Sequence, residues 1–235
     1  MATMAGIGSS KSKSVEHEGG RGLQKFVLEN GLSLILVAIF VITWTLQIYT
    51  GLHEYNDDCR ADGQPTASLI GYLQTGHFWE ATGENWESEF LQMAAFIWLT
   101  RCFYQRGSPE SNNPYEKEEE TPLTERSPWP ARAGGLVRKI YENSLTLAFL
   151  LMFAISFVIH VIGGHVEHNR EQLGRGLPGQ SLGEFLTSNT LWFQSMQNWQ
   201  SEFLSILMMV VLTIFLRQKG SPESKKVNAA NDEHE

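Results

Sequence analysis

Two long stretches of the sequence have no charged residue. Residues 30–53 and 143–166 contain no Asp, Glu, Lys or Arg, and each stretch is 24 residues long. About 20 apolar residues are enough for a helix to cross the ~30 Å hydrocarbon core of a bilayer. A soluble core built from 235 residues could hardly bury two such helices. The pattern therefore predicts an integral membrane protein in contact with the lipid bilayer, with spans at about 31–50 and 145–162.

Cysteine is scarce, and the familiar motifs of enzyme active sites are missing. The only cysteines, Cys59 and Cys102, are expected on opposite sides of the membrane, so we expect no disulfide between them. The sequence has no phosphate-cradling glycine motif, no nucleophile elbow and no HExxH pair, and we therefore do not expect an enzyme. The net charge is −8 and no segment concentrates basic residues, so nothing indicates binding to nucleic acid.

The sequence contains an internal repeat. When it is shifted by 113 residues, residues 26–111 align with residues 139–224 without a gap, and 29 of 86 positions are identical. Both copies end in the pentapeptide Gly-Ser-Pro-Glu-Ser. Each copy predicts a long apolar helix, a polar stretch with a short helix, and a second long helix that stops before Gly107 or Gly220.

The second long helix of each copy is the less apolar one. Only 11 residues separate Glu89 from Arg101, and only 14 separate Glu202 from Arg217, and neither run alone is long enough to span. Lys and Arg nevertheless alternate along the chain. Four precede the first span, then one, seven and two lie in the successive connections, and four follow the last span. This alternation fits the positive-inside rule if the second helices also cross, with both termini and the linker cytoplasmic.

The predicted fold class is therefore all-α, with four transmembrane helices in two tandem helical hairpins related as a parallel repeat. The expected divisions are a disordered cytoplasmic N-terminus (1–25), the first two-helix repeat (26–111), a cytoplasmic linker (112–137), the second two-helix repeat (138–224) and a disordered cytoplasmic tail (225–235).

Polar residues follow one face of each predicted second helix, because positions three and four apart share a face. The candidate residues are Asn85, Ser88, Glu89 and Gln92 on the second span, and Asn198, Ser201, Glu202 and Ser205 on the fourth. Lipid cannot satisfy these groups, so both stripes should face the bundle interior and approach each other. They act either as hydrogen-bonded glue between helices or as a shared ion or proton site, unless the glutamates are there only for the helix dipole.

Histidines are the other candidates for a site. His165 and His168 have a spacing that suits a metal ion, but they align with Leu52 and Tyr55 in the first copy. Polar histidines at the membrane interface are the simpler interpretation. A haem would need two facing histidines within the membrane, and only His160 qualifies. We therefore expect no metal and no cofactor.

Three motifs resemble those of a known family: Glu-Asn-Gly-Leu-Ser-Leu (29–34), Asn-Trp-Glu-Ser-Glu-Phe-Leu-Gln (85–92) and Arg-Gly-Ser-Pro-Glu-Ser (106–111). Over about residues 25–226 the chain resembles uncharacterised bacterial multi-pass membrane proteins that are known only as a domain of unknown function. The second copy departs from the pattern, with Gln197 and Gln200 where the first has Glu84 and Glu87. The resemblance implies the topology and a bacterial inner membrane, but no chemistry.

We therefore expect a structural or interaction protein of the membrane. The alternative is an ion- or proton-handling channel or transporter that uses the paired carboxylates of Glu89 and Glu202. Four helices alone leave little room for a pore, so transport would need a homodimer.

Overall fold

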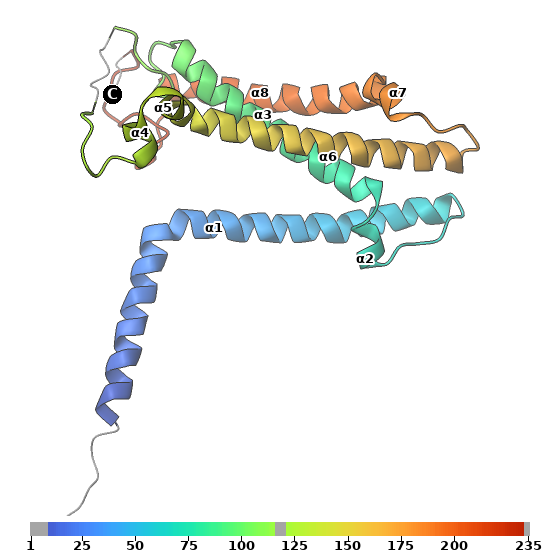
Figure 1. Ribbon diagram of the computed structural model, residues 1–235, viewed down its shortest axis with the longest axis horizontal. Coiled ribbons are helices and arrows are strands. Elements are labelled where there is room, and N and C mark those ends of the chain that lie inside the picture. The colour runs from blue at the N-terminus through green and yellow to red at the C-terminus, as the bar shows by residue number, and fades with distance from the viewer. Residues whose placement is uncertain (1–8, 116–120, 233–235) are drawn as a thin grey trace, which may run out of the picture. The chain divides into compact units, whose positions relative to one another are not determined.

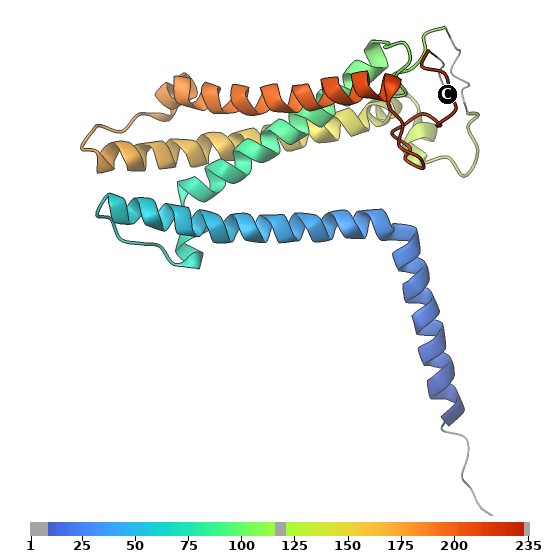
Figure 2. The same cartoon turned by 180° about the vertical axis from the view of Figure 1, so that it is seen from behind.

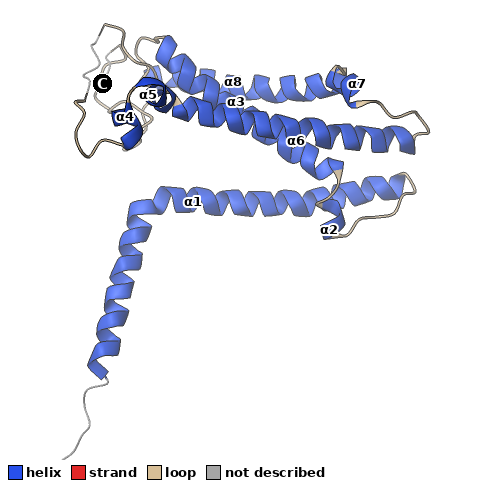
Figure 3. Ribbon diagram, in the orientation of Figure 1, coloured by secondary structure: helices blue, strands red, loops and turns tan. Residues whose placement is uncertain are grey.

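The computed structural model describes residues 9–115 and 121–232, and every regular element in them is a helix (Figures 1 and 3). The all-α prediction is confirmed. The helices are α1 (Ser9–Ala61), α2 (Leu69–Tyr72), α3 (Gly76–Cys102), α4 (Trp129–Ala133), α5 (Gly135–Glu142), α6 (Ser144–Gly174), α7 (Leu182–Leu186) and α8 (Asn189–Phe215).

In the part of the chain that the structure describes, three stretches are long and apolar enough to cross a membrane, where four were expected. They lie within Leu23–Ala61, Ser144–Gly174 and Leu182–Phe215. The missing one is α3, which is 27 residues long, as α8 is. Its four glutamates make its composition too polar. Length and composition therefore support a membrane protein with three candidate spans.

Helix boundaries and local bonds repeat at the offset of 113 residues. α3 and α8 match from end to end at that offset, and so do their N-caps. The hydroxyls of Thr75 and Ser188 each accept a hydrogen bond from the backbone N–H three residues on, as N-cap side chains do. Asn56 and Asn169 each hold the backbone eleven residues further on with two hydrogen bonds. Aligned residues therefore form the same caps and the same side-chain to backbone hydrogen bonds in both copies.

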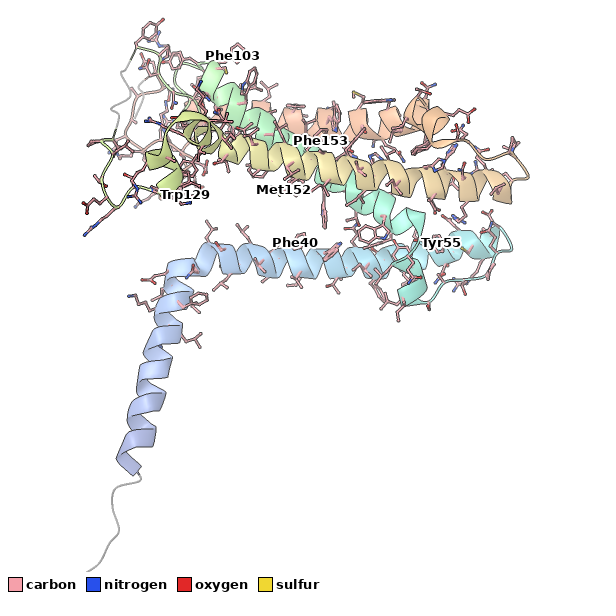
Figure 4. All side chains as sticks on the ribbon, viewed as in Figure 1. Phe40, Tyr55, Phe103, Trp129, Met152 and Phe153 are labelled. Carbon is pink, nitrogen blue, oxygen red and sulfur yellow. The ribbon has the colours of Figure 1, made fainter. Side chains whose placement is uncertain are left out.

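Residues 1–68 form one compact unit and residues 69–235 another. In the first unit α1 bends at Asn30, whose φ of −122° and ψ of 15° are not helical. Its side-chain Nδ2 donates to Phe26 O at 2.9 Å. Figure 1 shows the bend, and Phe40 lies on the arm that follows it (Figure 4). The segment after α1 folds back through the two bonds between Asn56 and Ala67.

In the second unit α3 packs along α6 and against α8 (Figure 2). Glycines let the backbones of α3 and α6 touch, as small residues do between membrane helices. A Cβ on Gly83 would lie 2.5 Å from His160 N, and a Cβ on Gly163 would lie 2.5 Å from Glu80 N. A larger residue at either place would push the helices apart. These contacts therefore decide which face of α3 points toward α6.

Segments expected to be disordered contain structure. Residues 9–25 belong to α1, and the expected linker 112–137 includes α4 and the start of α5. In the C-terminal tail Lys225 is 2% exposed, and its Nζ donates to the backbone oxygens of Ala230 (3.2 Å) and Asn231 (2.9 Å). Disorder was predicted from the polar composition alone. An ammonium group has three donors, however, and it can order a short polar segment by donating hydrogen bonds to several of its backbone carbonyls. Residues 1–8, 116–120 and 233–235 lie outside the described residues.

Candidate functional site

α3 carries three carboxyl groups on one face. Glu80, Glu84 and Glu87 stand at positions i, i+4 and i+7, so their side chains line up along the helix. At 1.5 Å per residue this carboxylate file extends over roughly 10 Å. It begins near the Gly76 end of α3 and runs toward its middle. Each of its members finds a partner on α6 or α8.

The deepest member of the file, Glu87, is paired with His160 of α6. Both side chains are 0% exposed, and His160 Nδ1 lies 3.0 Å from Glu87 Oε2. The other carboxyl oxygen, Oε1, accepts from Ser195 Oγ at 2.8 Å and from Trp199 Nε1 at 3.3 Å. A buried ion pair is tolerated only when further hydrogen bonds satisfy its remaining atoms. Glu87 meets that condition by joining three helices at one carboxyl group.

The other two members of the file are bound by amides of α8. Gln194 Nε2 donates to Glu80 Oε1 at 2.8 Å, and Asn198 Nδ2 donates to Glu84 Oε1 at 2.6 Å. Gln194 and Asn198 are four residues apart on α8, as Glu80 and Glu84 are on α3. Residues four apart share a helix face, so the two hydrogen bonds lie one turn apart along the contact between the helices. The amide donors compensate part of the cost of taking carboxylates out of water.

Both ring nitrogens of His160 face oxygen atoms. Nδ1 faces Glu87 Oε2, and Nε2 lies 3.4 Å from Gln194 Oε1. The amide of Gln194 is oriented by its other end, because Nε2 donates to Glu80. A neutral imidazole has one N–H and donates once, whereas a protonated imidazole donates from both nitrogens. The arrangement therefore fits one proton held between the two side chains, with either the ring or the carboxyl as the donor.

Aromatic rings lie beyond Glu87, toward the Cys102 end of α3. The ring centroids of Phe90 and Phe149 are 6.3 Å apart, and those of Phe153 and Trp199 are 6.2 Å apart. Figure 4 labels Phe153 on α6. Ala94, two turns beyond Glu87, is 2% exposed. We call Phe90, Phe149 and Phe153 the aromatic layer. The carboxyl groups of the file end before this layer, and one further polar contact between α3 and α8, from Gln92 Nε2 to the backbone oxygen of Glu202, lies beyond Glu87.

A second polar group lies at the Gly76 end of the file. Glu167 of α6 has a side chain 5% exposed, and Arg170 Nη2 contacts its Oε1 at 2.6 Å. The other oxygen of Glu167 accepts from the backbone N–H of His77 at 3.1 Å. Arg170 is 21% exposed, so this group connects the protein surface with the start of the carboxylate file. Gly76 packs its Cα directly against the backbone at Glu167 and makes this approach possible.

The residues predicted for the polar stripe are placed differently from one another. Asn198 binds Glu84, and Gln92 Nε2 donates to the backbone oxygen of Glu202 at 3.0 Å. Ser88 is buried, and its hydroxyl bonds to a carbonyl of its own helix. Glu202 is half-buried, whereas the exposed members are Asn85, Glu89, Ser201 and Ser205. The exposed four do not face the bundle interior as expected. For Asn85 and Glu89 the reason is that the glycine contacts with α6 turn a neighbouring face of α3 inward.

Sequence reasoning missed the central residues of the site. It took the inward face from positions that both copies share, but Glu84 and Glu87 are glutamines in the second copy, and His160 aligns with Gln47. These differences mark the places where the copies have separate roles. The spacing of the carboxylate file, together with a histidine inside an apolar helix, was the signal that could have found the site.

His165 and His168, considered as metal ligands, have other partners. His165 Nε2 lies 2.8 Å from Gln180 O, and His168 Nε2 lies 3.5 Å from Gln172 Nε2. Both rings also contact the ring of Phe185. Among the described residues, no group of three or more His, Cys, Asp or Glu side chains could hold a metal ion.

A family model described as a domain of unknown function (DUF6766) matches residues 23–235. The chain belongs to the DUF6766 family. The match covers nearly the whole sequence, including all three helices of the site, and it confirms that the chain belongs to a family of unknown function, as the resemblance implied. Comparison of this DUF6766 member with curated proteins and with solved structures finds no match.

Proposed function

We propose that this DUF6766 protein is a multi-pass protein of the bacterial inner membrane, with cytoplasmic termini and with α3 as its fourth span. Three of the four glutamates that make α3 too polar by composition are covered in the bundle, and the fourth, Glu89, is exposed. Glu80 and Glu84 accept from amides of α8, and Glu87 is fully buried. A helix whose polar groups are satisfied by neighbouring helices can lie in a membrane. The alternation of Lys and Arg along the chain supports the same orientation.

The biochemical role that follows is reversible proton binding at Glu87 and His160. The observation that carries it is the placing of both His160 nitrogens against oxygen atoms. Both contacts are satisfied only while the pair holds one proton more than a neutral ring with a carboxylate, either on the ring, which then donates twice, or on the Glu87 carboxyl, which then donates to Nδ1. Ionisable groups inside a membrane are costly, so they are functional candidates by default. Histidine is also the side chain whose ordinary pKa lies closest to neutral pH.

Loss of this proton would change the contact between α3 and α8. The neutral ring donates from one nitrogen only, so it must give up Glu87 or Gln194. The buried cluster also gains one net negative charge, and the glutamates of the carboxylate file repel one another more strongly at low dielectric. Since Glu80 and Glu84 are held only by neutral amides of α8, α8 is the helix that would shift. Proton occupancy is therefore coupled to the packing of α8.

The proton would reach the pair from the Gly76 end of α3. Described polar side chains continue in that direction through Glu80 to Glu167 and Arg170, whereas the aromatic layer lies on the opposite side. The carboxylate file thus has a polar group of side chains at its Gly76 end and aromatic rings at its other end. This arrangement suits loading or sensing of protons from one side of the membrane. It does not suit conduction through the bundle.

Trp199 is a built-in reporter for this proposal, because its indole N–H donates to Glu87 Oε1. The protein is labelled with 5-fluorotryptophan in nanodiscs, and a Trp199→Phe variant assigns one of the seven tryptophan resonances in the fluorine spectrum. We expect the Trp199 resonance to shift with pH between about pH 4 and about pH 9, the interval in which carboxyl and imidazole groups titrate in proteins. In Glu87→Gln that shift should vanish.

The matched control is Glu89→Gln, which removes an exposed carboxyl two residues further along α3. Its Trp199 resonance should titrate as in the wild type. If the wild-type resonance stays constant over the whole interval, Glu87 and His160 hold their proton permanently and the proton-handling role is wrong.

A purely structural role is the second candidate. It is favoured by one observation, namely that each carboxyl of the file already has a hydrogen-bond donor in the closed bundle. Under that role, the cluster holds α3, α6 and α8 together and never exchanges its proton. A folded Glu87→Gln variant that restores the phenotype of a deletion strain would support this role, because glutamine preserves shape but cannot titrate.

A further inference from the structure

α5 has one apolar side and one charged side. Successive residues turn by about 100° around a helix, which places its four large apolar side chains together. These are Leu136, Val137, Ile140 and Tyr141. They are all exposed, Leu136 by 72% and Ile140 by 52%. Within the unit that contains α5 no described element covers this side, so it is available to an apolar surface outside the protein.

The segment that contains α5 carries a net positive charge between Glu125 and Glu142. From Arg126 to Tyr141 it holds four basic residues, Arg126, Arg132, Arg138 and Lys139, and no Asp or Glu. Arg138 pairs with Glu142, the last residue of α5. Trp129 of the same segment is 67% exposed on α4 (Figure 4). A basic amphipathic helix flanked by tryptophan is the usual form of a segment that lies in a membrane interface.

A bend sets α5 apart from the apolar helix α6. Asn143, between them, has a φ of −115° and a ψ of 11°, and its Nδ2 donates to Lys139 O at 2.8 Å. Arg101 Nη1 donates to Asn143 Oδ1 at 2.7 Å, which ties the bend to the last turn of α3. α5 thus leaves the bundle at the level where α3 ends. In Figure 1 it is seen nearly end-on while α6 runs across the view.

The same bend occurs in the first copy, at Asn30, which aligns with Asn143. Asn30 also has non-helical angles, and its Nδ2 also donates to the carbonyl four residues before it. The residues ahead of that bend include exposed Leu23 and Leu28. The bend thus occurs at aligned positions of both copies, each time ahead of a long apolar helix. It is therefore a feature that both copies share.

A cavity of about 430 Å³ lies beside the second bend. Apolar side chains of α3 and α6 line it, among them Ile97, Trp98 and Leu145, and Arg101 stands at its polar end. Glu142 also lines the cavity, but its carboxyl is paired with Arg138 at 2.7 Å. An apolar wall beside the cation of Arg101 matches a lipid acyl chain with an anionic headgroup.

We propose that α5 lies in the headgroup layer of the leaflet at the Cys102 end of α3, and that the cavity beside Arg101 binds an anionic phospholipid of that leaflet. The four basic residues supply the charge complementarity, and the exposed apolar side of α5 enters the acyl boundary. The proposal goes beyond proton binding and does not depend on it. It needs only that the protein lies in a bilayer.

Spin-label accessibility tests the placement of α5 in the full chain. Single cysteines replace Leu136, Ile140 or Lys139 in a background with Cys59→Ala and Cys102→Ser, in nanodiscs that contain phosphatidylglycerol. Labels at Leu136 and Ile140 should be relaxed more by oxygen, which concentrates in the bilayer, than by a water-soluble nickel chelate. The label at Lys139 should show the reverse. Equal exposure of all three labels to the nickel chelate would overturn the proposal, and so would shielding of Leu136 and Ile140 from both reagents, which indicates a protein partner.

Lipid retention tests the cavity. The full chain is purified from mixed phosphatidylglycerol and phosphatidylcholine, and bound lipid is measured by native mass spectrometry. Arg101→Gln should lower the retained phosphatidylglycerol by about fivefold, since one basic residue near an anionic headgroup contributes ~1 kcal/mol. The matched control is Arg106→Gln, an exposed arginine that pairs with Asp232, and it should retain lipid like the wild type. Equal retention by Arg101→Gln and the wild type would overturn the lipid site.

Discussion

Replacing Glu87 by alanine or by glutamine separates the contributions of its two carboxyl oxygens. Alanine removes the acceptor for three donors at once, which are Ser195 Oγ, Trp199 Nε1 and His160 Nδ1. Each interhelical hydrogen bond in a membrane contributes ~0.6–2 kcal/mol. Breaking a buried ion pair by removing one partner costs about 3–5 kcal/mol, because the other charge stays buried. We therefore expect Glu87→Ala to lower the free energy of unfolding by about 3–5 kcal/mol.

Glutamine should cost much less. Its side-chain oxygen still accepts from Ser195 and Trp199, and its amide can donate to Nδ1 of a neutral His160. The loss should be about 1 kcal/mol, the value of a typical hydrogen bond. Both free energies are measured by reversible unfolding in bicelles with steric trapping. Glu89→Ala serves as the control, and it should stay within about 0.5 kcal/mol of the wild type because its side chain is exposed. Equal stability of the alanine and glutamine variants would refute the account of three donors on one acceptor.

The remaining predictions concern packing, pH and topology. Gly83→Ala should destabilise the bundle by about 1–3 kcal/mol through overpacking. Gly31→Ala should have no such effect, because no atom lies within 4 Å of the added Cβ. Thermal unfolding in detergent compares the two variants. Burial raises the pKa of Glu110 above its ordinary 4.5. Stability is therefore lost as pH rises from the ordinary value through the raised one, and Glu110→Gln should raise the melting temperature at neutral pH but not at about pH 4; equal differences at both pH values would contradict this. If α3 crosses the membrane, a cysteine at Asp62 should react with an impermeant thiol reagent in intact cells and one at Asn113 should not, and reaction at both would rule out the four-span arrangement.

Much of the secondary structure could be predicted because its causes are local. The short helix α7 has a capping box formed by Ser181 and Glu184, which are only three positions apart in the chain. The long helices follow the uncharged runs, and α3 ends before Gly107, as the stop signals indicated. Prediction was weaker where composition alone was used. The tail beyond residue 224 was expected to be disordered, yet Lys225 is buried among backbone carbonyls of that tail.

The candidate site could be predicted only in outline. Polar residues on the second helices were expected to meet inside the bundle, and Asn198 does so. Glu87 was passed over because the repeat does not preserve it, and His160 was considered only for haem. The bond between them joins residues 73 positions apart, and no spacing within one helix reveals such a partner.

By itself the sequence determined where the long apolar helices lie and where they end, since backbone hydrogen bonds, caps and apolar runs depend on residues close together in the chain. Only the tertiary structure decided which face of α3 is buried. A helix with polar residues on adjoining faces has two reasonable orientations, and backbone contact at Gly83 and Gly163 selects one of them. That choice turns Glu87 toward His160 and leaves Glu89 exposed, because close packing against α6 is possible only where α3 has no side chain in the way.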